Sequence, residues 1–168
     1  DVSYALPKAL KKEGADIMSF LDENSVNMKG VSIDEIYVGQ RKSFTKTVTE
    51  ADVNTFAGLT GDFNPVHVNA EYAKTTRFGG KIAHGMLTAS FISTVFGMTI
   101  PGADGIYLGQ TIKFLAPVRI GDTITAAIEV IKVMPEKKRF YARTTVTNQR
   151  GELVIDGEAT LMATKKTS

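Results

Sequence analysis

The chain of 168 residues contains no cysteine. Disulfide bonds, zinc sites built from thiolates and a cysteine nucleophile are therefore excluded. The absence of cysteine is compatible with a reducing compartment, and we expect a cytoplasmic protein. Any catalytic chemistry has to rest on other side chains.

Long hydrophobic runs and an excess of one charge are also missing. No apolar stretch approaches the ~20 residues that a membrane-spanning helix needs. The first residues, Asp1 to Tyr4, lack the basic region and the apolar stretch of a secretory signal. The sequence has 20 Lys and Arg and 18 Asp and Glu, so the net charge is only +2. We therefore expect no membrane association and no nucleic-acid partner, whereas an anionic small ligand would be tolerated.

What remains is the composition of an ordinary globular domain, with 43% hydrophobic and 23% charged residues. Residues 1–33 differ from the rest, because Pro7 is suited to open a short helix and Gly14 interrupts it. We predict a helical extension or linker over residues 1–33, and a single main domain over residues 34–168.

The main domain divides into a helical part and a part made of strands. Thr49 to Asp52 resembles a capping box, and Gly58 and Gly61 are expected to end the helix that it opens. From His84 to about Phe96, apolar and small residues surround much of the circumference, which is typical of a buried helix. Strands are predicted over 41–48, 106–114, 123–133, 139–147 and 152–163, and a short helix over 70–75. Long antiparallel strands with one buried helix predict an α+β domain in which the sheet wraps around that helix.

Asp62 and His67 lie five positions apart in a loop punctuated by glycine and proline. A carboxylate and an imidazole that approach the same volume can hold one water, with one group taking a proton and the other giving one. Pro65 fixes its own φ and restricts Asn64, which can hydrogen-bond locally and hold the turn. The spacing alone favours a simpler alternative, in which Asp62 caps the next segment and His67 is a hydrogen-bonded structural residue.

Gly85 follows His84 at the start of the predicted buried helix. A glycine in the first turn presents an unpaired N–H at the positive end of the helix dipole, and its missing side chain lets a carbonyl oxygen approach. Such an N–H can stabilise a thioester oxygen that gains enolate charge. Alternatively, Gly85 only lets the helix pack closely against a strand, and His84 is a cap or a packed residue.

Two other kinds of site have weaker support. Asp62 and the two histidines could ligate a metal ion, but no H-x-x-x-H or similar spacing is present, and we expect no metal. Ser90 or Ser93 beside His67 would suggest a nucleophilic serine, but neither lies in a G-x-S-x-G turn.

Several motifs together resemble one known family. The run from Phe56 to His67, FAGLTGDFNPVH, followed by Ala73, resembles the hydratase-2 motif of the MaoC-like family. AHGMLTAS over 83–90, IYLGQ over 106–110 and FLAPVRIGD over 114–122 are similar to the same family, in the same order. The resemblance covers about Val38 to Thr164, and within the family it is greatest to the bacterial (R)-specific enoyl-CoA hydratases that feed polyhydroxyalkanoate synthesis.

The resemblance implies a hot-dog fold, a long helix wrapped by an antiparallel sheet, assembled as a homodimer or a higher homo-oligomer. It implies reversible syn addition of water to trans-2-enoyl-CoA, giving (3R)-hydroxyacyl-CoA, with an acyl-CoA thioester as substrate and no cofactor. Asp62 and His67 match the catalytic positions, Gly85 matches the position whose N–H binds the thioester oxygen, and Ser93 matches a polar position that helps shape the site. Asn64, between the catalytic residues, is expected to contribute to substrate binding.

Three other functions remain on the same fold. A thioesterase of this fold usually carries a carboxylate on the central helix, but residues 84–96 contain neither Asp nor Glu. A hydroxyacyl-acyl-carrier-protein dehydratase would use the same chemistry on another carrier. An acyl-CoA-binding module would have no need of the Asp–His pair.

Overall fold

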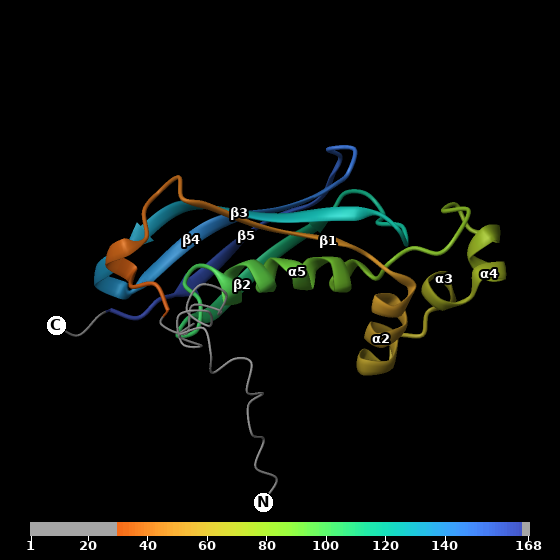
Figure 1. The fold of residues 1–168 in the computed structure, drawn as a ribbon, viewed down its shortest axis with the longest axis horizontal. Helices are drawn as coiled ribbons and strands as arrows, with labels where there is room; N and C mark the ends of the chain where they lie inside the picture. Colours follow the sequence, from red (N-terminus) through yellow and green to blue (C-terminus); the bar gives the residue numbers. More distant parts are fainter. Residues whose placement is uncertain (1–29, 166–168) are drawn as a thin grey trace, which may run out of the picture.

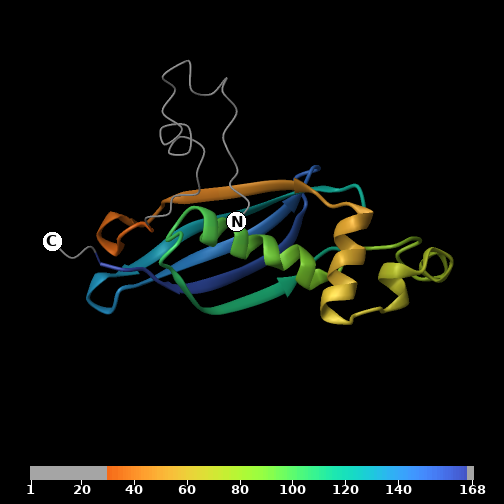
Figure 2. The same cartoon turned by 60° about the horizontal axis from the view of Figure 1, so that its bottom comes forward.

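A five-stranded antiparallel sheet is the largest element of the structure, a computed structural model that describes residues 30–165. The strands lie in the order β1–β3–β4–β5–β2, and all neighbouring strands are antiparallel. Figures 1 and 2 show the sheet curving over one helix, α5 (Gly85–Met98), which is the predicted hot-dog arrangement. The strands are β1 (Arg41–Thr47), β2 (Ile106–Phe114), β3 (Thr123–Met134), β4 (Arg139–Asn148) and β5 (Leu153–Met162).

Buried and more accessible side chains alternate along the central strands β3 and β4, and the buried ones define the face of the sheet that covers the helix. In β3 every second residue is buried, with Ile124, Ala126, Ile128 and Val130 at most 2% exposed. In β4 the same holds for Phe140, Ala142, Thr144 and Val146, which are all fully buried. Because successive side chains of a strand point to opposite faces, these residues line the concave face, as their period of two predicted.

Helix α5 has one buried face and one exposed face within the chain. Ile92, Val95 and Phe96 pack under the sheet and are at most 2% exposed. The opposite face, Met86, Ser90, Ser93 and Gly97, is exposed. The helix begins at Gly85, with His84 as its N-cap residue, and continues to Met98, two residues beyond the predicted end.

Three short helices cluster beyond the first turn of α5, as Figures 1 and 2 show. They are α2 (Glu50–Thr60), α3 (Pro65–Val68) and α4 (Ala70–Thr75). The predicted capping box opens α2: the Thr49 N–H donates to Asp52 at 2.8 Å, and the Asp52 N–H donates to the Thr49 hydroxyl at 3.2 Å. The prediction that Gly58 helps to end this helix was wrong, because α2 continues until Gly61, whose left-handed backbone (φ 78°) forms the C-cap.

The chain enters the described part beside the end of α5. The Val31 N–H donates to the Pro101 carbonyl at 2.6 Å, and the fully buried Ile33 donates to the Thr164 carbonyl at 2.9 Å. The predicted helical extension lies almost entirely in residues 1–29, outside the described residues. Over residues 30–165, no helix has the length and apolar character required to cross a membrane.

Asp122 connects two loops at one end of the sheet through hydrogen bonds: the loop before β3 and the turn between β4 and β5. Its carboxylate accepts from the Arg119 N–H at 2.8 Å, from the Gln149 amide at 2.7 Å and from the Arg150 guanidinium at 3.4 Å. Burial alone would raise the pKa of Asp122, but these hydrogen bonds and the charge of Arg150 outweigh it and bring the pKa below its ordinary value of 3.8. The carboxylate therefore stabilises the fold when it is ionised.

Replacing Asp122 with Asn is expected to lower the free energy of unfolding by about 1–3 kcal/mol at pH 7, the usual range for a buried charged hydrogen-bonding group. Since the folded pKa lies below the unfolded one, the contribution is complete above pH ~4 and disappears as the pH falls through the folded pKa. Urea unfolding of both proteins at pH 7 and pH 3 measures this, with the more exposed Asp156→Asn as control. An equal loss at both pH values would contradict the assignment.

Candidate functional site

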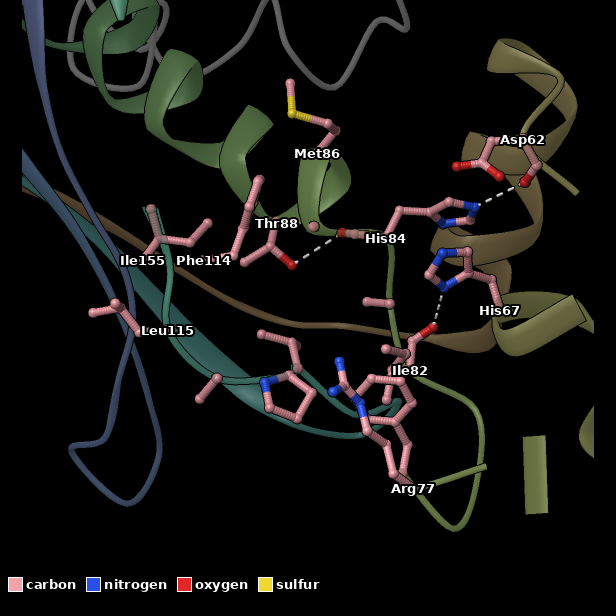
Figure 3. A pocket seen from close by; sticks show the side chains of 16 residues that line it. Asp62, His67, Arg77, Ile82, His84, Met86, Thr88, Phe114, Leu115 and Ile155 are labelled. Atoms are coloured by element: carbon pink, nitrogen blue, oxygen red, sulfur yellow. Dashed lines mark hydrogen bonds between the residues drawn. The ribbon is translucent and has the colours of Figure 1, made fainter. Parts of the chain in front are cut away.

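A cavity of about 440 Å³ lies where α3, the first turn of α5 and the end of β2 meet. Its wall is largely apolar, whereas Asp62, His67 and His84 provide polar atoms on one side (Figure 3). Apolar lining residues include Phe78, Ile82, Phe114, Leu115, Val118 and Ile155. A cavity of this size with a few polar groups at one end suits a ligand with an apolar chain and one reactive polar group.

Asp62 lies directly after Gly61, whose left-handed backbone turns the chain from α2 into the loop. The side chain is exposed, and its Oδ1 accepts from the Asn64 N–H at 3.2 Å. The Asn64 side chain in turn accepts from the Val66 N–H at 3.2 Å and caps α3. The prediction that Asn64 holds the turn is confirmed, and its contribution to substrate binding stays a prediction.

His67 lies in α3, a short helix, and the prediction of a loop at this position was wrong. The side chain is 9% exposed, and its Nδ1 lies 2.9 Å from the Ile82 carbonyl oxygen. Because a carbonyl can only accept, Nδ1 carries the hydrogen, and Nε2 of the neutral ring has a free lone pair. The hydrogen bond thus fixes both the ring and the nitrogen that is available as a base.

His84 lies beside both predicted catalytic residues. Its ring is 3.9 Å from the His67 ring between centroids, and its Nε2 lies 2.9 Å from the Asp62 carbonyl oxygen. Nε2 must therefore donate, which leaves the lone pair on Nδ1, and this nitrogen is buried without a hydrogen-bond partner. The prediction that His84 is a cap or a packed residue is confirmed, because it is the N-cap residue of α5 and 2% exposed. Its place beside His67 was not predicted, since the two histidines are 17 residues apart.

Gly85 combines the two roles that the sequence left open. A β-carbon on this residue would lie 2.8 Å from the Phe114 ring, so the glycine allows the end of β2 to pack against α5. Its N–H is at the start of α5, and no acceptor for it occurs among residues 30–165. This N–H, on the cavity wall at the positive end of the helix, is suited to hold a carbonyl oxygen.

Ser93 lies elsewhere on α5. It is eight residues after Gly85, about 12 Å along the helix axis, and lines a separate hollow of about 120 Å³ with Phe96 and Tyr107. The chain thus brings together Asp62, His67 and Gly85 but not Ser93, whose contribution to the site stays a prediction.

Asp62, His67 and His84 are also the group of side chains in the described part that could hold a metal ion. One candidate ligand atom from each residue lies within 4.8 Å of the other two. Two imidazoles and one carboxylate form a donor set that suits zinc and similar transition metals. The sequence spacing gave no support for such a set because His84 is 17 residues beyond His67.

Comparisons with known proteins agree with the fold and with the family that the motifs indicated. Residues 35–151 match the MaoC like domain. The chain is 54% identical over 129 residues to the (R)-specific enoyl-CoA hydratase of Rhodospirillum rubrum, covering 77% of this chain and 89% of that protein. It is 42% identical over 134 residues to a 3-hydroxybutyryl-CoA dehydratase of Methylorubrum extorquens, covering 79% and 84%.

Among solved structures, the R-hydratase PhaJ1 from Pseudomonas aeruginosa superposes with a TM-score of 0.78 at 43% identity, covering 82% of this chain and 88% of that one. The match extends over most of both chains. The hot-dog fold and the family that the motifs indicated are thereby confirmed, and the chain belongs to the MaoC-like family.

Proposed function

We propose that this chain is an (R)-specific enoyl-CoA hydratase, which adds water reversibly to trans-2-enoyl-CoA and gives (3R)-hydroxyacyl-CoA. The observation that carries the proposal is the arrangement of Asp62, His67 and the free Gly85 N–H around one largely apolar cavity. The named activities of its relatives, a hydratase and a dehydratase acting on CoA thioesters, are the two directions of this reaction.

A water held between the Asp62 carboxylate and Nε2 of His67 is the nucleophile. Its oxygen forms the bond to C3, one of its protons passes to the pair, and a proton is returned to C2 on the same face. In the neutral ring, the His67–Ile82 hydrogen bond places the hydrogen on Nδ1, so the lone pair that can accept a proton lies on Nε2. Proton transfer on one face of the double bond requires both groups on one side of the cavity, which Figure 3 shows.

The thioester oxygen binds at the Gly85 N–H. As water adds at C3, electron density moves to this oxygen and an enolate forms until C2 takes its proton. A preorganised N–H at the positive end of a helix stabilises that charge without reorganisation. All electrons stay within the substrate, so the reaction needs no redox cofactor.

Helix α5 also argues against hydrolysis of the thioester. None of its residues, Gly85 to Met98, is an Asp or a Glu. The carboxylate that hot-dog thioesterases place on this helix is therefore missing, whereas a hydratase can use the carboxylate on the loop before α3.

A homodimer is part of the proposal, because the two edges of the sheet differ. The edge strand β1 carries mainly polar residues, whereas β2 and the residue after it expose large apolar side chains. Ile106, Leu108, Phe114 and Leu115 are between 43% and 53% exposed. An open apolar edge strand is usually covered by a second copy across a two-fold axis, and each cavity would then be lined by both subunits.

A cytoplasmic location also stays an expectation, consistent with a chain without cysteine.

Asp62→Asn and His67→Gln are each expected to lower turnover by about 10²–10⁴-fold, because each removes proton exchange while keeping approximate shape. Since both groups act on one water, the double variant should lose much less than the product of the single losses. Hydration of crotonyl-CoA, with chiral analysis of the product, measures the activity. The same assay with the crotonyl group on an acyl carrier protein shows which of the two carriers the enzyme uses. Near-normal hydration in either single variant, at an unchanged melting temperature, would contradict the roles.

Gly85→Val is expected to lower kcat for crotonyl-CoA by up to about 10²–10³-fold, the effect of losing one oxyanion donor. The added side chain meets the Phe114 ring and crowds the N–H, while Asp62 and His67 are untouched. Gly85→Ala should have a smaller effect, because a single methyl group meets only the far end of the Phe114 ring and crowds the N–H less than valine does. An unchanged kcat in Gly85→Val would show that the carbonyl is held elsewhere.

Leu108→Lys is expected to weaken the dimer, because it places a charge on the exposed edge strand β2. Light scattering over a range of protein concentrations measures the mass, and Val38→Lys is the matched control, since Val38 is an exposed apolar residue outside both edge strands. A wild-type protein that is monomeric and fully active at micromolar concentration would contradict the dimer.

A further inference from the structure

We propose that Asp62, His67 and His84 bind one divalent transition-metal ion, with Zn²⁺ as the best match, and that the bound ion inhibits the enzyme. The inhibitory part rests on the proposed function, because it assigns the catalytic proton transfers to Asp62 and His67. The binding part rests on the geometry of the three side chains alone.

The three ligand atoms are near enough to close around one ion. They lie within 4.8 Å of one another, and bonds of about 2.0–2.2 Å from zinc to nitrogen or oxygen require pair separations of roughly 3.3 Å in a tetrahedral site. The Asp62 carboxylate is able to move toward the rings, because its side chain is exposed and, within residues 30–165, it accepts a hydrogen bond only from the Asn64 N–H.

The two imidazoles already have the hydrogen bonds typical of metal ligands. His67 donates from Nδ1 to the Ile82 carbonyl, and His84 donates from Nε2 to the Asp62 carbonyl, both at 2.9 Å. Metal-binding histidines almost always donate their second N–H in this way, which fixes the tautomer and the ring orientation. Each ring therefore keeps one lone pair, Nε2 of His67 and Nδ1 of His84, for an electron-pair acceptor.

The buried, unpaired Nδ1 of His84 points to a ligand at this site. His84 is 2% exposed, and this nitrogen has no hydrogen-bond partner. The His84 ring lies next to the His67 ring and is tilted by 31° against it, and Figure 3 shows this nitrogen on the side of the ring that faces His67. A buried polar atom without a partner is unfavourable and calls for an explanation, and a cation coordinated between the rings supplies one.

Metal binding would remove both catalytic groups at once. The ion would take the His67 lone pair that accepts a proton and the carboxylate that holds the water. Inhibition would be reversible, because it depends on coordination alone. Mg²⁺ would have little effect, since it prefers oxygen ligands and imidazole does not suit it.

Calorimetric titration of protein without an affinity tag, with ZnCl₂ and no substrate, tests the binding. We expect saturable binding of one Zn²⁺ per chain. His84→Phe, which keeps a ring beside His67, and Asp62→Asn should each weaken it by at least about tenfold, since loss of even a supporting group near a metal costs about 10–100-fold. Glu71→Gln on the neighbouring helix α4 is the control, and it should bind as the wild type does. Melting curves establish that each variant is folded.

Hydration of crotonyl-CoA under the same conditions tests the inhibition. Activity should fall over the zinc concentrations that fill the site, return with EDTA, and be unaffected by MgCl₂ at equal concentrations. Absence of saturable zinc binding, or equal affinity in the wild type, His84→Phe and Asp62→Asn, would overturn the site. Full activity with the site saturated would overturn the inhibition. Zinc binding that depends on the three residues in a protein without hydratase activity would support the site and refute the proposed function.

Discussion

The burial of helix α5 under the curved sheet is the constraint on which the rest of the structure depends. Residues from β3 and β4 are buried on the concave face because they cover this helix, and Phe96 of α5 packs against Phe140 of β4, with ring centroids 6.3 Å apart. With its axis fixed in this way, the helix has its first turn at one end of the sheet. The positive end of its dipole and the free Gly85 N–H are therefore held at the cavity by the packing of the core.

Backbone carbonyls orient the reactive side chains around that end. The Ile82 carbonyl holds His67 of α3, and the Asp62 carbonyl holds His84. The segment before α5 thus positions a side chain of α3, and the loop before α3 positions a side chain of that segment. The segment is anchored in turn, because the Ile82 N–H donates to the Val66 carbonyl and the Ala83 N–H donates to the Val118 carbonyl. The positions of the two imidazole rings thus depend on backbone carbonyl groups. A substitution at Ile82 or Asp62 changes the side chain but leaves these carbonyl groups in place.

The same arrangement explains why one site can suit two different occupants. Fixing the tautomer of His67 makes its Nε2 a base for water, and it makes the same nitrogen a ligand for an electron-pair acceptor. His84 supplies a second such nitrogen, although the hydration of an enoyl thioester does not require it. The proposed metal binding follows from an acid–base pair that has a second imidazole beside it. The apolar wall of the cavity suits the acyl chain of a substrate at the same place.

Much of the fold and part of the site followed from the sequence alone. The period-two burial of β3 and β4, the capping box at Thr49 and the buried helix after His84 are local patterns, because each reflects the conformation of a few consecutive residues. The motifs around Asp62 and His67 likewise indicated the family. These features were decided within short segments, so the order of the residues was enough to predict them.

Other features were decided only by the tertiary structure. The place of His84 beside His67 and the packing of Phe114 on Gly85 depend on contacts between separate segments. The helical turn of α3 was missed because its four residues are too few for a periodic pattern. Sequence determined which residue types were available for chemistry, and the packing of α5 against the sheet and the catalytic loop determined which of them meet, because only the folded chain fixes distances between residues that are far apart in sequence.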